Sequence, residues 1–159
     1  MAVDAFEVLF REQYPRLVAL ATAMTGSLEV GHDLAQETML RAYDRWDVVR
    51  GYEYQAAWLR RVLTNLAIDR HRSATSEAAA LARSQTERVG DTPRVAEWDQ
   101  LVADLDQRQR IVVTLYYGED RSVEEIAELL GLAAGTVKSA LWRARQRLRD
   151  IHQEEARDA

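Results

Sequence analysis

The sequence contains no cysteine, which excludes a disulfide framework and a thiolate metal site. Proline is rare, with only Pro15 and Pro93 in 159 residues, and glycine is sparse, so helices can run through most of the chain. There is no run of eighteen apolar residues to span a membrane, and the first residues lack the basic region and cleavage site of a secretory signal. We therefore expect a cytoplasmic protein without membrane insertion.

Residues that catalysis would need are missing as well. The three histidines, His32, His71 and His152, are too scattered for a metal cluster or a catalytic dyad. The sequence has no paired carboxylates in a suitable context, no glycine-rich phosphate loop and no nucleophile beside a base. We expect no enzymatic activity, no metal and no cofactor.

The apolar residues repeat with helical spacing, and strand-like alternation is absent. Together with an apolar content of 47%, this pattern predicts an all-α protein with real hydrophobic cores. Helices are expected at 4–25, 29–47, 55–73, 97–104, 107–118, 122–130 and 134–151. A kink or restart around Pro15 is left open in the first of them.

Between residues 74 and 95 the chain loses its large apolar side chains and keeps only Leu81 and Val89. Such a segment cannot bury much surface, which indicates a flexible linker. The predicted organisation is therefore two small helical domains, 1–73 and 96–153, joined by the linker 74–95 and followed by a C-terminal tail at 154–159.

The segment from Ser122 to Arg149 has the outline of a helix-turn-helix. Ser122 and Glu125 form a capping-box pattern at the start of its first helix, and Gly131 supplies the left-handed residue that ends it. Asp106 and Gln109 predict a second capped helix start shortly before this segment. Along the second helix of the motif, four apolar residues fall within one narrow arc: Val137, Leu141, Ala144 and Leu148.

The charges of these two helices have opposite signs. Residues 119–128 contain five acids and one base, whereas residues 136–149 contain one lysine, four arginines and no acid. A basic outer face of this kind fits the major groove of DNA, although solvated arginines on a surface helix would produce the same pattern. The net charge of −5 is a mild objection to nucleic-acid binding, but basic patches on an acidic body indicate specific docking with weak general DNA affinity.

Two helices of the first domain carry extensive polar faces. On the helix 29–47, charged and amide side chains lie opposite an apolar stripe. From the sequence pattern alone, the simpler interpretation is a solvated helix face on which opposite charges pair one turn apart. On 57–72 the residues expected to pack inward are Trp58, Val62 and Leu66, with Leu59 and Leu63 as further candidates. This leaves Arg60, Arg61, Thr64 and Asn65 outside, where arginine and asparagine near an aromatic residue suit the binding of single-stranded bases.

Four stretches together resemble a bacterial sigma factor of the extracytoplasmic function group: DLAQETMLRAYDRWD, VRG, AWLRRVLTNLAIDRHR and LDQRQRIVVTLYYGEDRSVEEIAELLGLAAGTVKSALWRARQRLRD. The resemblance extends from about Phe6 to Asp150, except for the linker. It is similar to the minimal form of the family, which has a region 2 helical bundle and a region 4 helix-turn-helix without a recognisable region 1.1 or 3.

The resemblance implies a function and a set of partners. A sigma factor binds core RNA polymerase through the β′ clamp helices and the β flap, recognises the minus-35 and minus-10 promoter elements and promotes strand opening. An anti-sigma factor is implied as a further partner. A stand-alone helix-turn-helix transcriptional regulator is the alternative, since the C-terminal domain alone fits many of those.

The same resemblance assigns roles to individual positions. Polymerase binding is implied for six residues of the 29–47 helix: Asp33, Leu34, Gln36, Glu37, Leu40 and Arg41. Binding of the minus-10 bases is implied for Val49, Arg50, Gly51, Arg60, Arg61 and Asn65. Minus-35 recognition is implied for Thr136, Lys138, Ser139, Arg143 and Arg145.

Some positions depart from the family pattern. Val49 and Arg60 stand where aromatic residues are common, so base capture is expected to rely less on ring stacking. Ala140 stands where relatives often have arginine, which removes one possible DNA contact, and Trp142 adds an aromatic side chain nearby. Ala133 lacks the side-chain oxygen of a good N-cap, so the start of the recognition helix is expected to fray.

Overall fold

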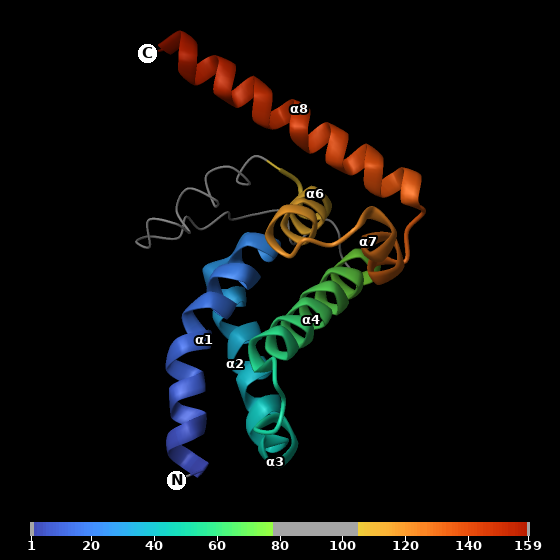
Figure 1. The fold of residues 1–159 in the computed structure, drawn as a ribbon. Helices are drawn as coiled ribbons and strands as arrows, with labels where there is room; N and C mark the ends of the chain where they lie inside the picture. Colours follow the sequence, from blue (N-terminus) through green and yellow to red (C-terminus); the bar gives the residue numbers. More distant parts are fainter. Residues whose placement is uncertain (1, 78–104, 159) are drawn as a thin grey trace. The chain divides into compact units, whose positions relative to one another are not determined.

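The computed structural model describes residues 2–77 and 105–158, and all regular structure in these ranges is helical (Figure 1). The all-α fold class is therefore confirmed. The chain divides into two compact units, Met1–Val89 and Gly90–Ala159, each of which is described by itself. The expected helix at 97–104 and residues 78–95 of the expected linker lie outside the described residues.

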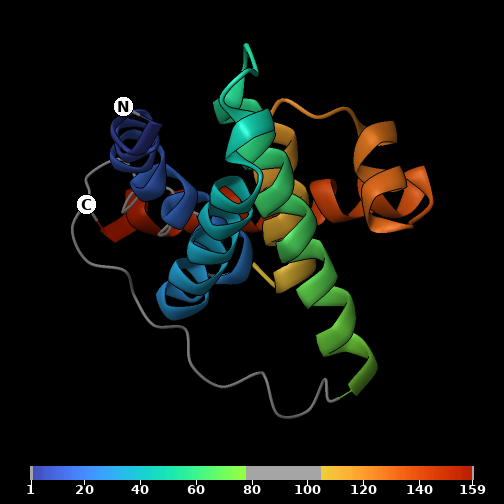
Figure 2. The same cartoon turned by 90° about the horizontal axis from the view of Figure 1, so that it is seen from below.

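Up to residue 77, the N-terminal unit consists of three long helices and one short helix: α1 (Ala2–Thr25), α2 (Leu28–Asp44), α3 (Trp46–Val49) and α4 (Gln55–Glu77). Helices α1 and α2 pack along each other, and α4 packs against both (Figure 2). Every one of these helices contributes to the core, whose most deeply buried side chains are Leu17, Met24, Thr38, Val49, Leu59 and Leu63.

Helix α1 continues through Pro15, so it is not restarted there. Proline removes one backbone hydrogen bond from a helix, but Leu9 and Leu17 are buried on either side of it and hold the helix against the core. The helix ends at Thr25, and the next residue, Gly26, has a φ of 75° and donates its N–H to the Thr22 carbonyl oxygen at 2.7 Å. A left-handed residue at this point favours glycine.

The expected helix at 29–47 is two helices in the structure. Ser27 is the N-cap of α2, and its Oγ accepts a hydrogen bond from the Val30 N–H at 3.3 Å. The backbone leaves the helical region at Arg45, where φ is −113° and ψ is 22°, and α3 follows directly.

The C-terminal unit contains α6 (Gln107–Val113), the π-helical turn η1 (Thr114–Gly118), α7 (Val123–Leu130) and α8 (Ala134–Asp158). Both α6 and α7 pack against α8. The expected helix at 107–118 thus changes geometry over its last five residues, where the Glu119 N–H donates to the Thr114 carbonyl oxygen at 3.1 Å. The side chains that close the core are Ile111, Leu115, Ile126 and Val137.

The helix ends of this unit agree closely with the capping patterns in the sequence. Asp106 and Gln109 form a complete capping box. The Gln109 N–H donates to Asp106 Oδ1 at 2.8 Å, and the Asp106 N–H donates to Gln109 Oε1 at 3.1 Å. Ser122 Oγ accepts from the Glu125 N–H at 3.1 Å, whereas the Glu125 carboxylate accepts from Arg121 Nη1 at 3.4 Å. Gly131 ends α7 in the left-handed conformation, with φ 65° and ψ 37°.

Helices α4 and α8 both continue beyond their predicted C-terminal ends. Helix α4 continues to Glu77, so residues 74–77 of the expected linker are helical. Helix α8 continues to Asp158, so residues 154–158 of the expected C-terminal tail are helical as well. Of the apolar arc predicted on α8, Val137, Leu141 and Ala144 are buried and Leu148 is partly exposed.

Candidate interaction surfaces

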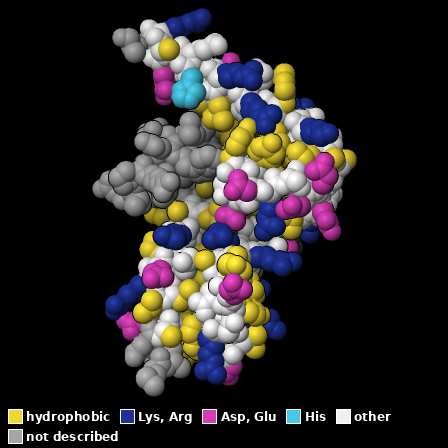
Figure 3. Space-filling view, in the orientation of Figure 1, with side chains coloured by type: hydrophobic (Ala, Val, Ile, Leu, Met, Phe, Trp, Pro, Cys, Tyr) yellow, Lys and Arg dark blue, Asp and Glu magenta, His cyan; other side chains and the backbone are white. Residues whose placement is uncertain are grey.

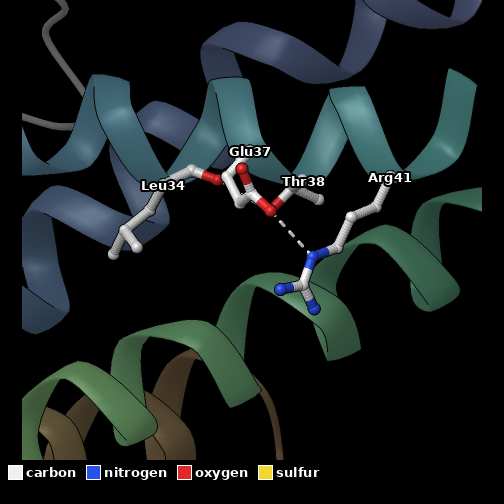
Figure 4. A network of polar contacts seen from close by, with 4 residues as sticks. All are labelled: Leu34, Glu37, Thr38 and Arg41. Atoms are coloured by element: carbon white, nitrogen blue, oxygen red, sulfur yellow. Dashed lines mark hydrogen bonds and ion pairs between the residues drawn. The ribbon is translucent and has the colours of Figure 1, made fainter. Parts of the chain in front are cut away.

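The outer face of α2 presents five of the six residues implied in polymerase binding. Asp33, Gln36, Glu37, Leu40 and Arg41 are all exposed. Arg41 Nε donates to Glu37 Oε1 at 3.0 Å across one helical turn, which agrees with the pairing expected on a solvated helix face (Figure 4). Leu40 is 55% exposed between these polar residues, so the face combines an ion pair with an unpartnered apolar side chain.

Leu34 is the exception within this group. Its side chain is only 8% exposed and belongs to the core, and its carbonyl oxygen accepts a hydrogen bond from Thr38 Oγ1 at 2.8 Å. Thr38 is itself fully buried, so the two residues lie on the inner side of α2, whereas Glu37 and Arg41 are exposed. Leu34 therefore supports the polar face rather than forming part of its surface.

The short helix α3 and the loop after it hold Val49, Arg50 and Gly51. Val49 is fully buried, which corrects the prediction that its side chain is available to a base. Arg50 and Gly51 are exposed. Gln55 Nε2 donates to the carbonyl oxygens of Val49 and Arg50 at 3.2 and 3.3 Å, so this amide closes the loop onto the start of α4.

Aromatic side chains of the same loop are absent from the predicted set. Tyr54 is 71% exposed, and the Tyr52 ring lies 6.0 Å from the Trp58 ring, measured between centroids. The sequence signal was the spacing of two tyrosines, two residues apart, directly before a helix. The loop therefore exposes two aromatic rings next to the buried Val49.

Helix α4 presents Arg60, Arg61 and Asn65 on its exposed side, as expected. Its buried face is centred on Leu59 and Leu63, the further candidates, which are fully buried. The three residues predicted to pack inward, Trp58, Val62 and Leu66, are each partly exposed. Thr64 was predicted to lie outside, but it follows Leu63 into the core and is buried.

On α8 the residues implied in minus-35 recognition form an accessible basic surface. Lys138, Ser139 and Arg143 are exposed, and Thr136 is partly exposed in the first turn. In Figure 3, Lys and Arg side chains follow α8, whereas Asp and Glu gather over α7. This agrees with the charge reversal predicted from the sequence.

The two unusual residues of α8 have opposite environments. Trp142 is 62% exposed beside the basic residues. Ala140 is buried, so its position faces the core, which corrects the view that it marks a lost DNA contact. An arginine there would have to leave the packed side of the helix to reach DNA.

Arg145 is exposed but is held by two tyrosines of η1. Its Nε donates to Tyr117 Oη at 2.7 Å, and its guanidinium carbon lies 5.7 and 5.8 Å from the ring centroids of Tyr116 and Tyr117. The hydrogen bond to Tyr117 raises the pKa of the Arg145 guanidinium above its ordinary value. The tyrosines are absent from the predicted set, because 28 residues separate Tyr117 from Arg145.

Neither unit contains a feature of a metal site or a membrane span within the described ranges. No three His, Asp or Glu side chains gather there as a metal site would require. Among the same residues, no helix is both long enough and apolar enough to cross a membrane.

Comparisons with known proteins identify the family to which each of the two units belongs. Family models for Sigma-70 region 2 and for Sigma-70, region 4 match residues 9–77 and 96–148. The RNA polymerase sigma-E factor of Streptomyces avermitilis is 34% identical over 149 residues, which cover 91% of this chain and 83% of that protein. The ECF RNA polymerase sigma factor SigW of Bacillus subtilis is 30% identical over 172 residues, covering 92% of this chain and 88% of that protein. The chain belongs to the extracytoplasmic function sigma factors.

The fold of this sigma factor also has a counterpart among solved structures. It is similar to the sigma factor RpoE, solved in complex with the anti-sigma factor NepR, from Bartonella quintana. The TM-score is 0.61 at 25% sequence identity, and the match covers 94% of this chain and 97% of the other. The N-terminal unit is thus the region 2 bundle and the C-terminal unit the region 4 helix-turn-helix.

Proposed function

We propose that this sigma factor binds core RNA polymerase, recognises a promoter at its minus-35 and minus-10 elements and promotes strand opening. The observation that carries the proposal is the presence of both sigma regions, in order, on two separate helical units. Its relatives are transcription factors rather than enzymes, which agrees with a role in initiation without covalent chemistry.

The polymerase-binding surface is the outer face of α2. Asp33, Gln36, Glu37 and Arg41 supply exposed polar groups, and Leu40 supplies an exposed apolar one. A mixture of this kind suits a protein interface, in which charges set orientation and an apolar residue is buried on binding. In this proposal the outer face of α2 binds the β′ clamp helices of the polymerase, and the C-terminal unit binds the β flap.

The minus-10 surface is the loop before α4 together with the exposed side of that helix. Arg50 and Gly51 lie in the loop, and Arg60, Arg61 and Asn65 lie on the helix. Extruding a base from the duplex costs a few kcal/mol of stacking free energy. Hydrogen bonds to an amide and stacking on exposed rings can offset this cost. In this proposal Tyr52 and Tyr54 take over the stacking that Val49 cannot provide.

The minus-35 surface is the exposed side of α8. Lys138 and Arg143 donate to base edges or phosphates, and Ser139 and Thr136 add hydroxyl donors near the start of the helix. Because one chain carries both DNA surfaces, binding of the first element makes binding of the second effectively intramolecular. An anti-sigma factor would oppose this by occupying either unit, and the protein would act in the cytoplasm.

Run-off transcription with purified core polymerase tests the proposal. Core enzyme plus this protein is expected to start transcripts at defined promoters in genomic DNA, and sequencing the transcript ends yields the two promoter elements. A stand-alone regulator would bind DNA without converting core enzyme into a promoter-specific form. That result would replace the proposed function by the alternative one.

A further inference from the structure

The contact between Tyr117 and Arg145 joins two segments that the sequence keeps far apart. The Nε–Oη hydrogen bond of 2.7 Å and the position of the guanidinium over both tyrosine rings fix the arginine at the side of α8. Tyr117 is nevertheless 48% exposed, and Arg145 is exposed as well. The pair is therefore accessible to solvent, and its hydrogen bond orients the guanidinium toward Tyr117.

The chemistry of the pair leaves donors for a ligand. A guanidinium has five N–H donors, and the bond to Tyr117 uses the one on Nε. The tyrosine oxygen accepts that bond, so its own O–H proton remains to be donated. Two oriented donor groups, one of them charged, match the oxygens of a phosphate.

The position of Arg145 on α8 indicates that the phosphate belongs to the DNA backbone. Lys138, Arg145 and Arg149 are spaced seven and four residues apart, which places them on one stripe of the helix at 100° per residue. All three are exposed, and no acid occurs between residues 136 and 149. The pair thus lies along the basic side of the recognition helix, where a DNA backbone would pass.

The π-helical turn is what brings Tyr117 to this stripe. Thr114 to Gly118 form i→i+5 geometry, which is uncommon and often marks functional positions. The turn has a cost, since Thr114 Oγ1 is buried without a hydrogen-bond partner. The residues of the turn include Tyr117, whose hydroxyl meets Arg145 Nε.

We propose that Tyr117 and Arg145 together form a phosphate clamp that grips the promoter backbone beside the minus-35 element. The proposal rests on the proposed function and adds to it a DNA-binding residue from outside the recognition helix. Because a phosphate carries no sequence information, the clamp sets the register of α8 in the groove and adds affinity on every sequence equally.

The test is a Tyr117→Phe variant of the full chain, assembled with core polymerase and titrated onto duplex promoter DNA. Loss of the hydroxyl is expected to weaken binding roughly threefold to thirtyfold, equally for promoters of different minus-35 sequence. In an Arg145→Ala background the same change should have no further effect, because the two residues act as a unit. Tyr14→Phe is the matched control, since its hydroxyl bonds His32 at 3.0 Å in the other unit and should leave binding unchanged.

Replacing single phosphates by neutral methylphosphonates identifies the contact. At one phosphate position the difference between wild type and Tyr117→Phe should disappear, and at the others it should remain. Unchanged affinity of Tyr117→Phe, with or without a lower melting temperature, would show that the pair only braces η1 against α8 and would overturn the clamp. A wild-type chain that fails to direct core polymerase to a promoter would instead overturn the proposed function, so the two failures are distinguishable.

Discussion

Gly31 on α2 lies directly against Thr22 on α1, so closely that a Cβ at position 31 would be 2.3 Å from Thr22 Oγ1. That hydroxyl donates to the Val18 carbonyl oxygen at 2.7 Å, and the same oxygen would lie 3.1 Å from the added Cβ. The two helices can approach this closely only because residue 31 has no side chain.

Gly31→Ala is therefore expected to destabilise region 2. The added methyl group must displace Thr22 or separate the helices, and overpacking of this kind costs about 1 to 3 kcal/mol. Gly135→Ala is the control, because a Cβ there meets nothing within 4 Å and alanine favours the helix by up to about 1 kcal/mol. Thermal unfolding of both variants checks the prediction, and equal melting temperatures would contradict it.

Ser122→Ala should destabilise the start of α7. The change removes the 3.1 Å hydrogen bond from the Glu125 N–H to Ser122 Oγ and is expected to cost about 1 kcal/mol in the free energy of unfolding. Ser122→Asp retains an acceptor and places a negative charge at the helix start, so it should preserve stability. Chemical denaturation of the three proteins measures the difference; a Ser122→Asp variant as unstable as Ser122→Ala would argue against a capping role.

The local features of the fold were the ones that the sequence could predict. The caps at Asp106 and Ser122 and the left-handed Gly131 depend on residues within a few positions of one another, so short patterns identify them. The polar face of α2 and the basic face of α8 follow from helical periodicity in the same way. For these features the local preference and the tertiary structure agree.

The features that the sequence did not predict depend on contacts between distant segments. The buried side of α4 is set by where α1 and α2 lie, so the sequence named Leu59 and Leu63 only as further candidates and wrongly favoured Trp58 and Val62. The π-helical turn has no compositional signature, so nothing in the sequence indicated that Tyr117 would reach Arg145. Sites formed across such distances become visible only in the fold.

Asn65→Ala should impair strand opening more than duplex binding. Asn65 is exposed on α4 in the proposed minus-10 surface, and an amide that holds an unpaired base contributes about 1 kcal/mol, or roughly fivefold. Permanganate reactivity of promoter thymines measures opening, and binding to a minus-35 duplex measures docking. Equal effects on the two measurements would count against the capture of a base by Asn65.

Arg143→Ala should weaken promoter binding by about 1 to 3 kcal/mol if its guanidinium reads a base edge. The loss should then be concentrated at one position of the minus-35 element, so that the variant tolerates other bases there. Arg157→Ala removes the same kind of exposed side chain near the far end of α8 and should leave binding unchanged. An equal loss on all promoter sequences would make Arg143 a phosphate contact instead.

Glu37→Lys should weaken the binding of core polymerase by tenfold or more, on the order of 1.4 kcal/mol. The change breaks the 3.0 Å pair with Arg41 and reverses a charge at the centre of the proposed interface. An exposed pair of this kind contributes only about 0.5 kcal/mol to folding, so the variant should stay folded. Fluorescence titration of labelled protein with core enzyme measures the affinity.

Glu7 and Arg11 form the same kind of exposed pair on α1, which makes Glu7→Lys a matched control. Both variants change the net charge by the same amount and lose one ion pair across a helical turn, but only one lies in the proposed interface. If the two weaken polymerase binding equally, the effect is one of overall charge, and α2 has no special role. Loss confined to Glu37→Lys, with circular dichroism and melting temperature close to wild type, would mean that the solvated pair on α2 is a binding surface.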